Sequence, residues 1–390
     1  MESVSASAPI PAALEVRPVE GRRDRAAFIN LQWEIYQDDP AWVPPLRLDR
    51  AQFLDQKKHP FFLHGAAQPL LALRDGRPVG RLVVAEDPNY NELHGTRQAT
   101  VGLFEAGEDP QVAAALFDAA EAWARARGLD TLVGPIDYST NYPCGLLIDG
   151  FDTPPRVMMN HNPAYYGALF EGAGFTKAKD LYAYWINADQ PLPDRFRRVA
   201  ELAARRGQVT LRTARMSDFK AEVARVKEIY NHAWEKNWGF VRMTDAEFDH
   251  LASELRLAID PDLLFIAEVD GRPVGFSLAL PDINEALAHL PSGRLTPLGV
   301  GKLLYYRKKI RTLRLVILGV LDGYRRRGIA ELMILRTYDA GKAKGYQACE
   351  MSWTLEDNEL INRPIELIGG ERYKTYRIYQ RPISPPARGG

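Results

Sequence analysis

The chain contains an internal repeat. The segment DGRPVG stands at residues 75–80 and again at 270–275, each time between two apolar stretches, which is typical of a β-hairpin. A second pair, GALFEGAGF at 167–175 and RPIELIGGE at 363–371, has nearly the same offset, and each copy precedes a tyrosine-rich stretch. Two matches in the same order indicate the duplication of one structural unit.

Each copy has the same expected order of elements. It opens with an amphipathic helix, because apolar residues recur at helical spacing over 28–35 and over 223–234. Apolar strands and further helices then alternate along the chain. Such a mixture predicts an α/β fold of two halves, each a mixed central sheet flanked by helices.

The repeat also predicts the domain boundaries. The two halves are expected to span 14–190 and 209–383. Residues 191–208 begin with prolines and continue as a basic helix, which we expect to link the halves and to pack between them. Residues 1–13 and 384–390 are expected to be a disordered lead and a disordered tail.

Composition excludes several classes of protein. Lys plus Arg and Asp plus Glu number 50 each, so the charge balance gives no reason to expect a nucleic-acid partner. Cys144 and Cys349 match no metal-ligand spacing, and we expect a cytoplasmic protein without a metal. No apolar run approaches the roughly 20 residues of a transmembrane helix. The oligomeric state does not follow from the sequence.

An anion-binding site is predicted after the apolar stretch LVILGVL at 315–321. There, Arg325, Arg326 and Arg327 precede Gly328 and a segment with helical periodicity. The N-terminus of a helix presents unpaired N–H groups and the positive end of the helix dipole. A small residue lets a phosphate approach these groups, and the arginines add positive charge. A surface turn with solvated arginines is the alternative.

The segment LGVLDGYRRRGIAELMI resembles the acyl-CoA signature of the GNAT superfamily, which reads Gln/Arg-x-x-Gly-x-Gly/Ala after a strand. Arg325, Gly328 and Ala330 match its defining positions, and Val320 matches a valine that usually ends the strand. Further on, TLEDNELINRPIELIGGERYKTYRIY resembles the closing segment of that fold, with Asn358 at its usual asparagine. The resemblance implies two tandem GNAT domains with acyl-CoA as co-substrate.

The resemblance also implies roles for particular residues. Backbone groups of Leu318 and Val320 would pair with the pantetheine arm of CoA, and a backbone N–H there would stabilise the oxyanion. The loop 325–330 would hold the pyrophosphate. The implied cofactor-binding residues are Leu318, Val320, Arg325, Arg326, Arg327, Gly328, Ile329, Ala330 and Asn358.

The first half differs at the corresponding place. Its apolar strand at 99–105 is followed by Glu108, Asp109 and Pro110, and then by a helix. Asp109 is a good N-cap and Pro110 a good first helical residue, so this helix is expected to be capped by its own carboxylate. Both carboxylates would repel a pyrophosphate. We therefore expect one acyl-CoA site per chain, in the second half.

The chemistry of the superfamily requires a base, because an aliphatic ammonium has a pKa of about 10 and must lose a proton before it attacks a thioester. Glu350 is the first candidate, since it alternates with Cys349 and Met351 and so points to the opposite face of a strand. A salt bridge to an arginine is the alternative for Glu350. A tyrosine often protonates the thiolate in this superfamily, but by the spacing from Asn358 that position is Ile365.

A long loop at 134–170 is the second source of candidates. It is rich in Gly, Pro, Asn and Tyr and follows a predicted strand, as binding loops often do. His161 and Tyr138 are further catalytic candidates, which would reach across from the first half. The polar candidates of this loop are Asp137, Tyr138, Asn141, His161, Tyr165 and Tyr166. Turn formation and packing are the alternative for each of them.

Together with residues 31–45 and 236–240, this loop resembles a particular tandem-GNAT family. One branch of that family is implicated in bacterial ceramide synthesis, in which a long-chain acyl-CoA acylates a sphingoid amine. The resemblance implies an acyl-CoA N-acyltransferase that acts on a small-molecule or lipid amine. Acetylation of a small-molecule or protein amine, and a non-catalytic acyl-CoA sensor, are the alternatives.

The segment 293–314 mixes apolar and basic residues, among them Leu303, Leu304, Lys302 and Lys308. A basic amphipathic stretch is typical of peripheral contact with an anionic membrane. The alternative is a solvated helix that covers the sheet.

Overall fold

The computed structural model describes residues 13–206, 208–256 and 258–383, so most of the expected lead and all of the expected tail lie outside the described residues. The strands are β1 (Leu14–Pro18), β2 (Ala66–Arg74), β3 (Arg77–Glu86), β4 (Gln98–Ala106), β5 (Thr131–Gly134), β6 (Leu146–Asp149), β7 (Thr176–Asn187), β8 (Val209–Thr213), β9 (Leu264–Val269), β10 (Arg272–Pro281), β11 (Thr312–Val320), β12 (Ala348–Leu355) and β13 (Glu371–Pro382). They form one mixed sheet in the order β1-β2-β3-β4-β5-β13-β7-β12-β11-β10-β9-β8, with β6 also paired to β13.

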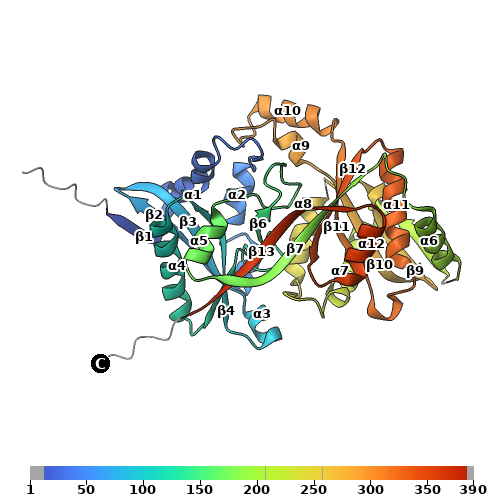
Figure 1. Ribbon diagram of the computed structural model, residues 1–390, viewed down its shortest axis with the longest axis horizontal. Coiled ribbons are helices and arrows are strands. Elements are labelled where there is room, and N and C mark those ends of the chain that lie inside the picture. Colours follow the sequence, from blue (N-terminus) through green and yellow to red (C-terminus); the bar gives the residue numbers. More distant parts are fainter. Residues whose placement is uncertain (1–12, 207, 257, 384–390) are drawn as a thin grey trace, which may run out of the picture.

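Helices cover both faces of this sheet (Figure 1). They are α1 (Gly21–Ile35), α2 (Arg47–Phe53), α3 (Pro88–His94), α4 (Pro110–Arg125), α5 (Tyr166–Gly172), α6 (Asp194–Arg206), α7 (Phe219–Ala233), α8 (Asp245–Leu255), α9 (Asn284–Leu287), α10 (Pro297–Arg307), α11 (Ile329–Ala343) and α12 (Glu359–Leu367). Alternate residues of β2 face opposite layers: Leu70 packs in the core that contains α4, and Leu71 in the core that contains α1. The expected α/β fold with flanking helices is confirmed.

Both DGRPVG segments form the predicted hairpins. The β2–β3 turn has Asp75 and Gly76 at φ values of 50° and 76°, and the β9–β10 turn has Asp270 and Gly271 at the same two values. A positive φ at both central residues defines a type I′ turn, whose twist matches that of a two-residue hairpin.

The two halves exchange their last strands. β7 is the last strand of the first half in sequence but lies between β12 and β13, whereas β13, the last strand of the second half, lies between β7 and β5. Figure 1 shows β7 and β13 running together through the centre of the molecule. The expected boundary at residue 190 therefore does not coincide with a boundary in the sheet. The sequence repeat does not reveal this exchange, because two similar tyrosine-rich strands are equally suited to either neighbour.

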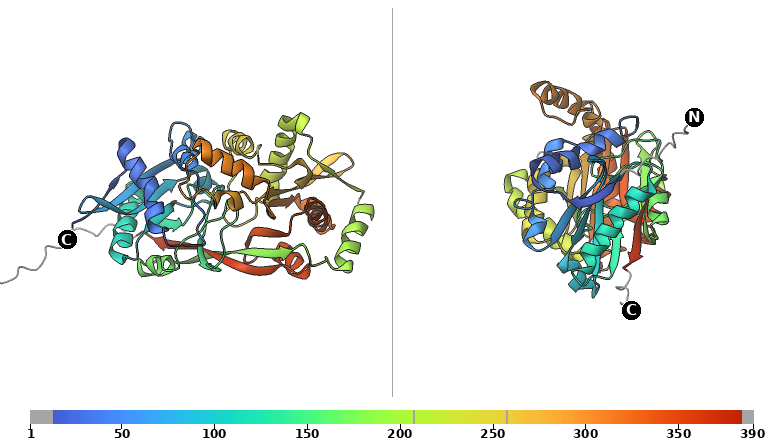
Figure 2. Two further views of the ribbon diagram at one scale, coloured as in Figure 1. Left: turned by 90° about the horizontal axis from the view of Figure 1, so that it is seen from above. Right: turned by 90° about the vertical axis from the view of Figure 1, so that its left-hand side faces the viewer.

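The basic helix expected between the halves lies elsewhere. α6 packs on α11 at the outer end of the second half (Figures 1 and 2). Its Ala200 is buried in the core of that half, and the guanidinium of Arg197 lies 2.9 Å from a carboxylate oxygen of Asp339 on α11. The expectation that residues 191–208 pack between the halves is wrong, because the apolar face of α6 belongs to the second-half core.

Candidate active site

The central strands of the second half, β11 and β12, separate partway along their length. They pair in parallel only from Thr312 with Ala348 to Leu315 with Met351. Against β10, the register of β11 skips Val316, which forms a bulge. Beyond the bulge, the edge of β11 that faces β12 has no strand paired to it. The backbone N–H and C=O groups of this edge are therefore available to another partner.

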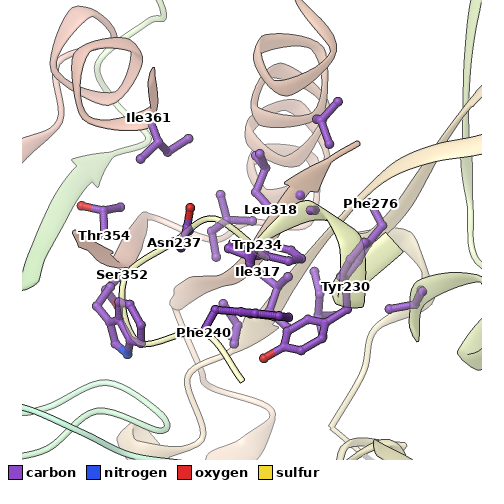
Figure 3. A pocket seen from close by; sticks show the side chains of 18 of the residues that line it. Tyr230, Trp234, Asn237, Phe240, Phe276, Ile317, Leu318, Ser352, Thr354 and Ile361 are labelled. Carbon is purple, nitrogen blue, oxygen red and sulfur yellow. The ribbon is translucent and has the colours of Figure 1, made fainter. Parts of the chain in front are cut away.

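A cavity of about 450 Å³ opens where these strands separate. Its walls come from β11, β12, α7, α8 and the loop 234–243. Figure 3 shows the side chains of Tyr230, Trp234 and Phe240 gathered beside Ile317 and Leu318. The walls are mainly apolar, which suits an apolar ligand with a few polar anchors.

The packing of one side chain in the cavity wall requires a glycine in β11. A Cβ atom added to Gly319 would lie 2.2 Å from the indole ring of Trp234. The indole therefore lies directly over the backbone of β11, and any larger residue at 319 would displace it. The repeat and the apolar pattern of the strand did not reveal this contact.

The helix that follows β11 begins without a side-chain cap. Gly328 precedes α11 as its N-cap residue with a φ of 77°, in the left-handed region that favours glycine, and no side chain bonds to the first turn. The first N–H groups of α11 have no intrahelical acceptors. The structure therefore has an uncapped helix N-terminus where the sequence predicted an anion-binding site.

The three arginines beside it differ in their contacts. Arg325 is held by the loop itself: its Nη1 lies 2.7 Å from Asp322, and its Nε donates to the carbonyl of Val320 at 3.1 Å. Arg326 and Arg327 are exposed, and the guanidinium of Arg327 lies 5.0 Å from the centre of the Tyr324 ring. Two exposed positive charges thus stand beside the helix N-terminus, while Arg325 fixes the shape of the loop.

The structure brings most of the predicted cofactor-binding residues to one cavity. Those that line it are Leu318, Val320, Arg325, Arg326, Ile329, Ala330 and Asn358. Arg327 and Gly328 belong to the same loop but not to the lining. Ile365, at the position of the superfamily tyrosine, also lines the cavity and is buried, so this position carries no hydroxyl group.

Glu350 is completely buried behind the cavity wall. The hydroxyl groups of Ser352 and Tyr373 donate hydrogen bonds to its carboxylate, and Nε of Arg314 lies 3.4 Å from it. Burial, followed by the charge of Glu350, raises the pKa of Tyr373. Glu350 does not line the cavity, but Ser352 and Arg314 do. The contact with an arginine, which was the alternative role for Glu350, is present. The hydroxyl group of Ser352 also connects the Glu350 carboxylate to the cavity.

The corresponding site in the first half is filled by the chain itself. β4 and β5 pair only over 98–100 and 131–133. Past that point, Ile136 donates from its backbone N–H to Val101, and the carboxylate of Asp137 accepts from the N–H of Leu103 at 2.8 Å. Burial raises the pKa of Asp137 to about 6. The loop 134–145 thus occupies the space between the strands.

The helix beyond this filled site has the predicted cap. Asp109 precedes α4 and accepts from the N–H groups of Gln111 and Val112, and Pro110 is the first residue of the helix. The carboxylate of Asp109 also bonds to Arg74 at 2.6 Å. This helix N-terminus is therefore occupied by an internal anion.

Tyr138 and His161 do not reach the cavity. The ring of Tyr138 stacks between those of Phe53 and Phe61, with centroid distances of 4.6 and 4.9 Å, and its hydroxyl donates to the carbonyl of Phe53. The Nε2 of His161 lies 2.7 Å from Asp39, and burial of the side chain lowers the pKa of its imidazole. Both residues stabilise the first half, and we do not include them in the proposed catalytic group.

Two other polar candidates of the loop also bond within the first half. Tyr165 donates to the carbonyl of Ala106 at 2.9 Å, and Tyr166 donates to the carboxylate of Glu105 at 2.7 Å. Of the six polar candidates, Asn141 is the one that lines the cavity.

The first half nevertheless forms part of the cavity wall, through residues 140–143 and Met158. Polar contacts hold this wall to the second half. Tyr142 donates to Glu247 of α8 at 2.8 Å, and Tyr230 of α7 donates to Asn141 at 3.0 Å. The hydroxyl of Thr140 also donates to the carbonyl of Gly239. Sequence reasoning missed this set, because it depends on the contact between the halves.

The described residues show neither a metal centre nor a membrane span. Among them, no group of three or more His, Cys, Asp and Glu side chains is arranged to hold a metal ion. No helix in the same ranges is long and apolar enough to cross a bilayer.

A strand pair that opens beside an uncapped helix N-terminus, in a sheet built from two similar halves, defines a tandem acyltransferase of the GNAT class. Residues 223–361 match the model of the acetyltransferase (GNAT) family. The chain is 39% identical over 375 residues to protein YghO of Escherichia coli (strain K12), which covers 94% of this chain and 95% of YghO. It is 38% identical over 382 residues to the bacterial ceramide synthase of Caulobacter vibrioides (strain NA1000 / CB15N). This similarity covers 95% of this chain and 98% of the ceramide synthase.

The chain therefore belongs to the GNAT family, whose members use an acyl-CoA as co-substrate, and it is an N-acyltransferase. Solved structures have a similar tandem fold. One is the tandem GNAT protein from the clavulanic acid biosynthesis pathway, with 15% identity, a TM-score of 0.58 and coverage of 96% of this chain and 100% of that chain. Another is a GCN5-related N-acetyltransferase from Sphaerobacter thermophilus, with 16% identity, a TM-score of 0.51 and coverage of 95% and 96%.

Proposed function

We propose that this enzyme transfers a long-chain acyl group from acyl-CoA to a lipid amine of the sphingoid type. The observation that carries the proposal is the apolar cavity, which extends from the opening between β11 and β12 to the apolar residues of α7 and α8. An acetyl group needs no such space. The relative named as a bacterial ceramide synthase, similar over nearly the full chain, supports the same substrate class.

In this proposal each part of acyl-CoA binds to a different part of the cavity or of its rim. The pyrophosphate lies at the N-terminus of α11, with Arg326 and Arg327 as counter-charges. The pantetheine arm pairs with the free edge of β11 at Leu318 and Val320. The acyl chain extends beneath Trp234. One acyl-CoA is bound per chain, because the corresponding opening in the first half is filled by residues 134–145.

Glu350 is the proposed base, and it acts through Ser352. The amine donates its proton to the hydroxyl of Ser352, which passes its own proton to the carboxylate of Glu350. The neutral amine attacks the thioester carbonyl, the N–C bond forms and the C–S bond breaks. The nitrogen loses its second proton as the amide forms, and the departing CoA thiolate takes up this proton and leaves as the thiol. Support comes from the hydrogen bond between Ser352 and Glu350, and from the position of Ser352 on the cavity wall.

The enzyme is proposed to be cytoplasmic and to contact the membrane peripherally, since a sphingoid amine resides in a bilayer. The acceptor class is tested by the release of CoA thiol from acyl-CoAs of graded length, with a long-chain amine or a short soluble amine as acceptor. We expect turnover only when a long acyl chain and a long-chain amine are combined. Equal turnover with acetyl-CoA and a short amine would contradict the proposal, and acyl-CoA binding without thiol release would indicate a sensor.

A further inference from the structure

Helix α10 carries an exposed apolar face. The exposed fractions of Leu298, Leu304 and Tyr305 are 73%, 56% and 55%, and Gly299 is the one buried residue of this helix. At about 100° per residue, these three side chains lie on one side of the helix. Leu295, just before the helix, adds a further exposed apolar side chain.

The helix stands away from the body of the protein. Figures 1 and 2 show α10 above the sheet, supported by α9. The rings of His289 and Tyr306 stack at 3.5 Å and hold its inner side, and Thr296 caps its first turn. The apolar side is therefore turned outward by a fixed support. This differs from the alternative considered for this segment, a solvated helix that covers the sheet.

Positive charge surrounds this face. Residues 294–311 contain six basic side chains and no Asp or Glu: Arg294, Lys302, Arg307, Lys308, Lys309 and Arg311. All six are exposed. Within the described residues, no salt bridge joins Lys302, Lys308 or Lys309 to a carboxylate. The chain as a whole has no net charge, so this concentration of charge is local.

We propose that α10 is a docking surface for an anionic lipid bilayer. The apolar side chains enter the boundary between headgroups and acyl chains, while the basic residues contact anionic headgroups. The charge of the face selects this partner over a neutral surface. Residues 308–311 join α10 directly to the first residue of β11, so docking places the beginning of this strand on the membrane side of the protein. The proposal goes beyond acyl transfer, because it concerns where the enzyme binds.

The test is co-sedimentation of the full chain with vesicles, measured without turnover. We expect about tenfold stronger binding to phosphatidylcholine vesicles that contain phosphatidylglycerol than to phosphatidylcholine alone, and weaker binding at high salt. Leu298→Glu should reduce binding about tenfold. Leu367→Glu is the matched control, since Leu367 is also 73% exposed but lies on α12, and it should bind as the unaltered chain does.

Equal binding of the Leu298→Glu and Leu367→Glu variants would overturn the proposal, as would an unaltered chain that does not sediment with anionic vesicles. Gel filtration distinguishes a second copy as the occupant: a dimer that Leu298→Glu converts to a monomer, with vesicle binding unchanged, also overturns it. Failure of the acyl-transfer proposal would be seen separately, in the thiol-release assay with detergent-dispersed substrates.

Discussion

At the scale of single residues, the second-half site depends on two glycines and one hydroxyl group. Gly319 admits the indole of Trp234, and Gly328 takes the left-handed conformation that begins α11. Ser352 connects the cavity to a carboxylate that is otherwise sealed from it. Gly319 thus leaves space for a ring, Gly328 supplies a positive φ, and Ser352 supplies a hydroxyl group.

Gly328→Glu is expected to abolish CoA binding. The substitution strains a left-handed backbone position and puts a carboxylate beside the helix N-terminus, so we expect affinity to fall more than about tenfold. Isothermal titration with CoA measures it. Gly323→Glu is the control, because it adds the same charge in the same loop at a position with open space around it, and it should retain most of the affinity. Unchanged affinity in the Gly328 variant would move the site elsewhere.

Ser352→Ala is expected to lower kcat about 100-fold while KM for acyl-CoA stays within about threefold, because the hydroxyl that carries the proton is removed. Glu350→Gln should lower kcat to a similar degree. Ser352→Thr retains the hydroxyl and should restore much of the rate. If the alanine variant keeps the kcat of the unaltered enzyme, or if the threonine variant is as slow as the alanine variant, the hydroxyl does not carry the proton.

Asp137 should make stability depend on pH. Burial raises the pKa of its carboxyl group to about 6 in the folded state, so the folded chain holds this proton more tightly than the unfolded chain does. Its contribution is complete below the unfolded value of about 4 and is lost as pH rises through 6, a change of about 3 kcal/mol in the free energy of unfolding.

Urea denaturation at pH 4 and pH 7 measures this change. Asp137→Asn keeps an oxygen acceptor for the N–H of Leu103 but does not titrate. The Asp137→Asn variant should therefore become more stable relative to the unaltered chain as pH rises. A constant difference at all pH values would show that Asp137 has the same pKa in both states.

At the scale of elements, contacts between the halves hold the wall of the second-half cavity in place. α8 and the loop 234–243 form the outer wall, and Tyr142, Asn141 and Thr140 of the first half bond to them or to α7. The first half is thus not an inactive copy. Its loop fills its own cofactor opening and at the same time closes the cavity of the other half.

Tyr142→Phe should therefore act on long substrates. Loss of the hydrogen bond to Glu247 leaves a buried carboxylate with one partner fewer, at a cost of about 1–3 kcal/mol to the closed cover. We expect KM for a long-chain acyl-CoA to rise several-fold, with little change in the Kd of CoA itself, which carries no acyl chain. Tyr165→Phe is the control, since its hydroxyl bonds to Ala106 within the first half. An equal loss of affinity for CoA itself would contradict a role in covering the acyl chain.

At the scale of the whole molecule, the exchange of β7 and β13 makes one structure of two repeats. β13 pairs with β5 of the first half, and β7 pairs with β12 of the second. Neither half has its full complement of strand partners without the other. Cooperative unfolding of the whole chain is the physical consequence, because the shared strands connect both cores.

Separate expression of 13–190 and 191–383 tests this consequence. Each fragment exposes an unpaired central strand edge, so we expect both to aggregate when expressed alone. Co-expression should recover a soluble complex, since the exchanged strands then find their partners. Gel filtration and circular dichroism measure the outcome. A fragment that is soluble, folded and monomeric by itself would show that the exchange is not needed for stability.

The sequence by itself determined the repeat, both hairpins, the cap of α4 and the segment that holds most of the proposed cofactor residues. These features are local, since a few neighbouring residues and their backbone preferences specify them. Tertiary structure alone decided which half each last strand joins, where α6 packs, that Tyr138 and His161 lie away from the cavity, and that Ser352 connects it to Glu350. These depend on contacts between distant segments, where an apolar residue that lines a cavity and one that fills a core have the same appearance in sequence.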